Sequence, residues 1–251
     1  MAHGSRLLLE ACVDTLASAV NAERGGADRV ELCADLADAG TTPSHGVLSS
    51  VLQRLSIPVF PIIRPRGGGF VYDDGDITIM RADLRHAREL GAPGAVIGGL
   101  TAAGEVAADV IAMLRDEGRD MQLTFHRAFD VCRDAAAALE TLIRLGVDRV
   151  LTSGQRATAW EGRETIAALV RQAAGRITIL AGGSITESNA ADLIRFTGVV
   201  ELHVRGVTLQ RDAGPDHRIP FRKALPEDES ARAVTDPARI AAVRQAVAIT
   251  N

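Results

Sequence analysis

The sequence predicts one α/β domain folded as a (β/α)8 TIM barrel. Eight short apolar runs rich in Val, Ile and Leu recur along the 251 residues, and helix-like segments rich in Ala, Leu, Arg and Glu separate them. This alternation is typical of βαβ units with a parallel sheet, and eight such units close a barrel. An open doubly wound sheet is the alternative fold, but no G-x-G-x-x-G motif follows the first run.

Several of the expected strands begin soon after a turn at the end of a helix. In GGADRVEL (25–32) and LGVDRVLT (145–152), a glycine ends a helix and an apolar strand follows. The expected helices include 15–24, 78–90, 134–145 and 161–174. The expected strands are 7–12, 29–33, 59–64, 94–100, 121–126, 149–153, 177–181 and 199–203.

The chain ends and the 207–235 segment differ from this pattern. Residues 1–5 have the composition of a tag remnant or a disordered end. Residues 207–235 are polar and hold three prolines, so we expect an irregular excursion before a last helix that begins near Pro237. Nothing else resembles a linker, so residues 1–251 are predicted to form a single domain.

Composition argues against several classes of partner. The net charge is −4 and aromatic residues make up 3% of the chain, so we expect no nucleic-acid partner. No apolar run approaches the ~20 residues needed to span a bilayer, so no membrane partner is expected. The N-terminus shows no secretory pattern, and three cysteines cannot all pair within one chain. Reduced thiols in the cytoplasm are therefore expected.

Two neighbouring strands are expected to end alike. Glu10 and Cys12 end the first strand, and Glu31 and Cys33 end the second. Side chains two apart share a face, so two carboxylates and two thiols should converge at one depth near the barrel mouth. Core packing of small free cysteines is the alternative for the thiols. For the carboxylates, the alternative is a structural ion pair with an arginine that follows another strand, Arg64 or Arg127.

Other polar residues at strand ends indicate an anion site. Arginines suit carboxylates or phosphates, and glycines before a helix expose N–H groups to an anion. An ordinary turn with Ser184 or Thr186 as the helix N-cap would explain the glycines and the serine equally well. The candidate anion-binding residues are Arg64, Arg66, Arg127, Gly182, Gly183 and Ser184.

The same ring of residues also predicts a catalytic alternative. Glu10 or Glu31 would act as the base, and His126 or His203 as the acid or electrophile. A divalent metal held by both glutamates and one of these histidines is a further alternative. The enzyme would be an isomerase or lyase that moves a proton on a small phosphorylated or carboxylated metabolite.

Several long motifs resemble the CutC family of copper homeostasis proteins. They include EACVDTLASAVNAERGGADRVELC (10–33), PVFPIIRPRGGGFVYDDGD (58–76), LTFHRAFD (123–130) and AGGSIT (181–186), and the resemblance runs from about residue 7 to 205. It implies a cytosolic TIM barrel linked to copper handling and assembled as a homo-oligomer, either a dimer or a tetramer. The family's copper(I) ligands are a cysteine pair that matches Cys12 and Cys33. Val204-Arg205 and the tail after 207 depart from the family pattern.

The primary prediction is therefore a cytosolic homeostasis protein that binds copper(I) through the two cysteines. Thiolates are soft ligands that suit copper(I). A small anionic metabolite is the second partner under consideration, because the arginines and glycines at the strand ends could hold one. Arg205 could sharpen this anion binding or form an ion pair.

Overall fold

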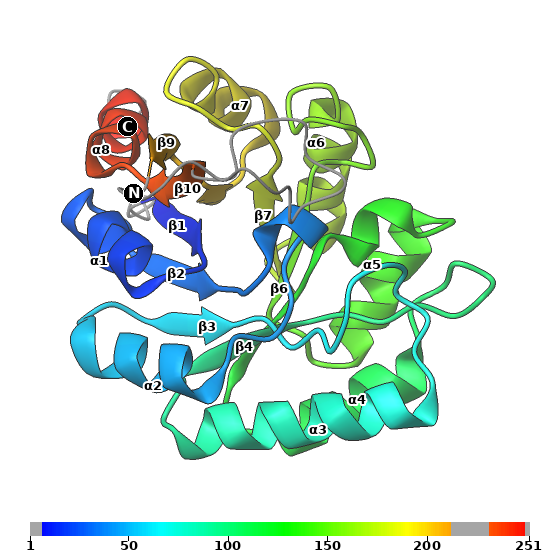
Figure 1. Ribbon diagram of the computed structural model, residues 1–251. Coiled ribbons are helices and arrows are strands. Elements are labelled where there is room, and N and C mark those ends of the chain that lie inside the picture. Colours follow the sequence, from blue (N-terminus) through cyan, green and yellow to red (C-terminus); the bar gives the residue numbers. More distant parts are fainter. Residues whose placement is uncertain (1–6, 212–230, 249–251) are drawn as a thin grey trace.

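The computed structural model describes residues 7–211 and 231–248. The prediction for residues 1–5 lies outside the described residues, as does the proline-containing middle of the 207–235 segment. Eight parallel strands form the barrel (Figure 1), and each overlaps one predicted from the sequence. They are β1 Leu8–Val13, β2 Arg29–Leu32, β3 Val59–Pro61, β4 Gly94–Ile97, β5 Gln122–Phe125, β6 Arg149–Thr152, β7 Thr178–Gly182 and β8 Glu201–Val204.

Strand pairing runs in the order β3-β2-β1-β8-β7-β6-β5-β4. A parallel bridge between Ile62 and Val96 joins the two ends, and the Ile63 amide donates to the Val96 carbonyl at 2.7 Å. The barrel is thus nearly closed, and the predicted (β/α)8 architecture is confirmed.

Helices surround the sheet on the outside of the barrel (Figure 1). The α-helices are α1 Leu16–Arg24, α2 His45–Arg54, α3 Asp74–Glu89, α4 Ala108–Glu117, α5 Ala135–Arg144, α6 Arg163–Ala173, α7 Ala190–Thr197 and α8 Pro237–Ala248. Side chains of Thr15, Ser44, Asp73 and Asp134 cap α1, α2, α3 and α5 by accepting from backbone N–H groups. Two 3-10 turns, η1 Leu36–Asp38 and η2 Arg127–Val131, follow β2 and β5. Within the described residues, no helix is long and apolar enough to cross a membrane.

The predicted excursion is not irregular at its two ends. Residues Val207–Arg211 form β9 and Ala231–Thr235 form β10, and the two strands pair antiparallel. Their alternating side chains suit an antiparallel ribbon, and the three prolines that indicated irregular structure lie between them. The Asn21 side chain of α1 donates to the Thr235 carbonyl at 2.9 Å, which fixes β10 against the barrel wall. The last helix then begins at Pro237, as predicted.

The barrel interior has its own small apolar cluster. It holds Cys12, Cys33, Phe60, Ile62 and Val96, separate from the larger core between the strands and the helices. Glycines at the start of β4 and just after it make room for two rings: a Cβ at Gly94 would lie 2.3 Å from the Phe60 ring, and one at Gly98 would lie 2.1 Å from His126. The thiols therefore lie within a packed interior.

Candidate metal centre

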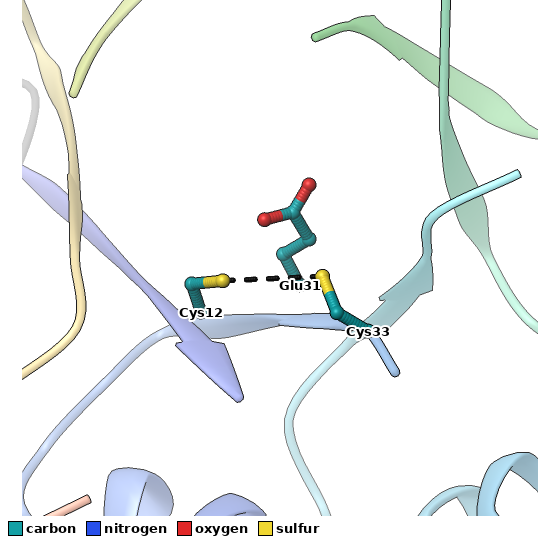
Figure 2. Close-up of side chains that lie close together, drawn as sticks. All are labelled: Cys12, Glu31 and Cys33. Carbon is teal, nitrogen blue, oxygen red and sulfur yellow. Dashed lines mark hydrogen bonds between the residues drawn. The ribbon is translucent and has the colours of Figure 1, made fainter. Parts of the chain in front are cut away.

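Two cysteines and a glutamate meet inside the barrel near the ends of β1 and β2. The Sγ atoms of Cys12 and Cys33 are 3.9 Å apart, and one ligand atom from each of Cys12, Glu31 and Cys33 lies within 4.8 Å of the others. Figure 2 shows the sulfurs facing each other with the Glu31 side chain beside them. All three residues are buried. This metal cluster (Cys12, Glu31 and Cys33) is the one such group of metal-ligating side chains found among the described residues.

The sequence suggested that the two E-x-C endings lie at one depth. The structure shows that they do not. The register places Cys12 opposite Glu31, and Glu10 opposite Arg29. Barrel closure requires neighbouring strands to be staggered, and here the stagger shifts β2 by one inward-facing position. The thiols still meet because Cys33 follows β2 directly and its side chain faces the same interior as Cys12.

Protons in the cluster are unevenly shared. The hydrogen bond between the two sulfurs holds the pKa of Cys12 well below its usual value, and His203 adds to the effect. The same hydrogen bond, reinforced by burial, raises the pKa of Cys33. Burial raises the pKa of Glu31, and the neighbouring negative charge of Cys12 raises it further. Of the two thiols, Cys12 is therefore the easier to deprotonate, and the protonated form of Glu31 is favoured.

His203 on β8 links the metal cluster to a charged layer beneath it. Its Nδ1 lies 2.7 Å from Glu10, and its Nε2 lies 3.7 Å from Glu31. Burial alone would lower the pKa of His203, but the hydrogen bonds with Cys12 and Glu10 and the nearby carboxylates raise it well above its usual value. The shift favours the imidazolium form of His203, beside the thiol whose pKa is lowered.

The layer beneath is a network of buried carboxylates and arginines. Arg29 Nε donates to Glu10 at 2.5 Å, and its Nη2 donates to Glu201 at 2.6 Å. The Nε of Arg149 is also 2.9 Å from Glu201. Burial by itself would raise the pKa of Glu10, but the charge of Arg29 and the hydrogen bond from His203 outweigh it and lower that pKa to about 2. Glu10 is thus an ionised partner in a structural network.

The expected ion-pair partners of the glutamates were Arg64 and Arg127, and this expectation was wrong. Arg64 instead holds three backbone carbonyls, those of Asp38, Gly40 and Gly68, at 2.6–2.8 Å. It thereby fixes the loops after β2 and β3. The true partner, Arg29, begins β2 and shares its inward face with Glu31 and Cys33, so the period-two pattern could have revealed it.

His126 and Arg127 belong to a separate interaction that locks the loop after β5. The His126 ring accepts from the Ala128 amide, and burial and then the charge of Arg64 lower its pKa to about 3. Asp130 accepts from Arg127, from the Thr152 hydroxyl at 2.5 Å, and from both the amide and the hydroxyl of Ser153. The HRAFD motif thus ties the end of β5 to the end of β6.

The candidate anion-binding residues divide into two sets. Arg127, Gly183 and Ser184 line a cavity of about 370 Å³ at the ends of β7 and β8, together with His203 and Arg205. Arg64 and Arg66 do not line it. Arg66 forms an ion pair of 2.8 Å with Asp76 on α3.

Gly182 lies behind the cavity wall. A Cβ there would be 2.6 Å from Leu151 and 3.2 Å from the His203 Cβ, so this glycine lets the histidine pack closely against β7. The cavity is also lined by Arg239 of α8, a residue that sequence reasoning missed because it lies beyond the 207–235 segment.

The alternative divalent-metal set is not assembled. Glu10 contacts Arg29 and His203. In the described part of the chain, neither glutamate belongs to a group of three metal-ligating side chains that includes His126 or His203. Two thiols with one carboxyl group form a softer donor set than the carboxylates and imidazole that were expected.

Comparisons with known proteins identify the family of this chain. The family model described as the CutC family matches residues 7–208. The human copper homeostasis protein cutC homolog is 46% identical over 93% of this chain and 86% of its own length, and a CutC family protein of Pasteurella multocida is 42% identical over 95% and 98%.

Solved structures agree as well. A CutC protein from Streptococcus agalactiae has 36% identity and a TM-score of 0.76, covering 79% of this chain and 98% of its own. N-(5'-phosphoribosyl)anthranilate isomerase from Pyrococcus furiosus, at 12% identity and a TM-score of 0.59 over 97% and 100%, shares the fold alone. The model match and the identities over most of the chain show that this protein belongs to the CutC family.

Proposed function

We propose that this protein is a copper homeostasis protein that binds one copper(I) ion through Cys12 and Cys33. The observation that carries the proposal is the pair of buried thiols with sulfurs 3.9 Å apart. Two metal–sulfur bonds of no more than ~2.3 Å can span that separation, so both sulfurs can reach one ion. Thiolates are the soft ligands that copper(I) prefers.

The charges around the metal cluster suit a monovalent cation. Copper(I) would displace the proton that lies between the two sulfurs, so binding should release protons. His203 offsets the remaining negative charge of the two thiolates. Glu31 is a neutral hard donor and supplies little to a soft ion.

Burial of the two sulfurs favours retention of copper over rapid transfer. Cys12 and Cys33 are 5% and 1% exposed, and Phe60, Ile62 and Val96 pack beside them. An ion held there must wait for the barrel mouth to open, so we expect slow exchange.

The family also supports the rest of the proposal. Relatives that are 45–46% identical are named copper homeostasis proteins. We place the protein in the cytoplasm, where its free thiols stay reduced, and we expect a dimer or tetramer in solution. Light scattering after gel filtration would measure the subunit number.

The isomerase or lyase alternative has less support in this geometry. A general base must be sufficiently basic, and Glu10 has a pKa of about 2 and is held by Arg29. His126 is packed against Phe70 and caps η2, and its pKa is lowered to about 3. Glu10 as the base and His126 as the acid are therefore poorly supported.

An anaerobic competition titration with a coloured copper(I) chelator tests the copper proposal. The wild type should take one equivalent, and Cys12→Ser/Cys33→Ser should take none. Cys132→Ser is the matched control, because Cys132 is also buried and its sulfur donates to the Ala128 carbonyl rather than to a second thiol. Undiminished copper(I) binding by the double variant would overturn the proposal.

A further inference from the structure

A basic cavity lies beside the metal cluster, at the ends of β7 and β8. It has a volume of about 370 Å³, and β9 and α8 complete its wall. Three arginines line it, one from each of three separate segments: Arg127 after β5, Arg205 after β8 and Arg239 on α8. One carboxylate, Glu187, also lines it, so the wall is predominantly cationic.

Two of these arginines, Arg205 and Arg239, form no ion pair with a carboxylate of the described residues. Among residues 7–211 and 231–248, no acidic side chain lies within 4.0 Å of Arg205 or Arg239. Asp14 lies near enough to Arg205 for its carboxyl group to feel the positive charge, but too far for an ion pair. Arg127 is held in place by Asp130 at 2.7 Å and by the Ser153 hydroxyl at 2.6 Å.

The cavity wall also presents unpaired backbone donors. In the described part of the chain, the amide N–H groups of Gly183, Ser184 and Ile185 meet no acceptor. Gly183 and Ser184 both have positive φ, 111° and 56°, and the strained conformation of Ser184 is one that a non-glycine residue rarely adopts. Successive N–H groups in such a turn form a concave site for an anion.

We propose that this cavity binds a small phosphate monoester. A phosphate monoester dianion has three terminal oxygens that accept strong hydrogen bonds, which matches three N–H groups backed by three guanidinium groups. A single carboxylate has two oxygens and would leave more of these donors unpaired. The volume is at the lower end of the range for small-molecule pockets, so the organic part of the ligand is small.

The position of the cavity would connect such a ligand with the metal cluster. His203 lines the cavity and also contacts Glu10 at 2.7 Å and lies 3.7 Å from Glu31. A bound phosphate ester would therefore lie against the histidine that borders the two thiols. The binding itself does not depend on copper.

Amide NMR spectra of the full chain, titrated with glycerol 3-phosphate, inorganic phosphate and succinate, test the proposal. Glycerol 3-phosphate should shift the signals of Gly183, Ser184 and Ile185, inorganic phosphate should shift the same signals more weakly, and succinate should leave them in place. Arg205→Gln and Arg239→Gln should each weaken binding by about 10- to 100-fold. Arg171→Gln, an exposed arginine of α6 outside the cavity, should change nothing.

Two further measurements separate this proposal from the copper proposal. Cys12→Ser/Cys33→Ser should keep its phosphate-ester binding, and Arg205→Gln/Arg239→Gln should keep its copper(I) binding, which also shows that it folds. Absence of shifts at Gly183–Ile185, wild-type affinity in the double arginine variant, or equal binding of succinate would each overturn the phosphate-ester site.

Discussion

Two layers of side chains inside the barrel differ in how their buried polar groups are paired. In the lower layer, Glu10 and Glu201 both contact Arg29. The metal cluster lies two residues further along β1 and β2, which is the next inward-facing position. There Cys12 faces Cys33, and the nearest basic side chain to Glu31 is His203 at 3.7 Å. A guanidinium already neutralises the charge of the carboxylate that it pairs with, so that carboxylate attracts a metal ion less strongly. Two thiols that share a proton can exchange it for a metal ion.

The largest expected effect is on the stability contributed by the lower layer. Arg29→Met should lower the free energy of unfolding by about 3–5 kcal/mol, because it leaves two carboxylates buried without their shared cation. Urea unfolding measures the loss. Adding Glu10→Gln to this variant should recover part of it, and Arg171→Met on the surface should have little effect. A loss below ~1 kcal/mol would show that Arg29 does not hold this layer together.

Acid should weaken the same layer in a defined pH range. The folded-state pKa of Glu10, about 2, lies below its ordinary value of 4.5, so its contribution is complete above pH 4.5 and is lost as pH falls toward 2. The slope from this group should be at most about 1.4 kcal/mol per pH unit. Unfolding free energies between pH 6 and 3 should fall more steeply for the wild type than for Glu10→Gln. Parallel curves would contradict the assignment.

Most of the fold was predictable because it depends on local patterns. The eight apolar runs and their glycine-terminated helices were sufficient for the barrel, and alternation placed Cys12 and Cys33 on the inward face. The register was not predictable, since strand stagger depends on closure of the whole barrel. That stagger places Cys12 opposite Glu31 and decides that Arg29, instead of Arg64 or Arg127, neutralises Glu10.

The ring of polar residues at the strand ends was predicted as a single site, and the structure divides it. Arg64 and Arg66 follow β3, the strand next to β2, but neither joins the metal cluster. Arg64 fixes loops by donating to backbone carbonyls, and Arg66 pairs with Asp76. Chain order alone cannot show which acceptors a long arginine side chain will reach. Arg239 lines the cavity because α8 follows the β9–β10 ribbon and lies beside the barrel mouth. No local sequence pattern indicates this position of α8.

The smallest expected effect tests whether Glu31 belongs functionally with the thiols or only lies beside them. Its raised pKa favours the neutral carboxylic acid, and Glu31→Gln keeps a neutral oxygen donor of similar shape at this position. A soft ion gains little from either, and we expect the copper(I) dissociation constant to change by less than about 10-fold. Cys33→Ser, by contrast, removes a soft ligand and should weaken binding by far more. The chelator competition assay measures both variants under the same conditions. If Glu31→Gln loses as much affinity as Cys33→Ser, the carboxylate is a third ligand, and the site would suit a harder, divalent ion better than copper(I).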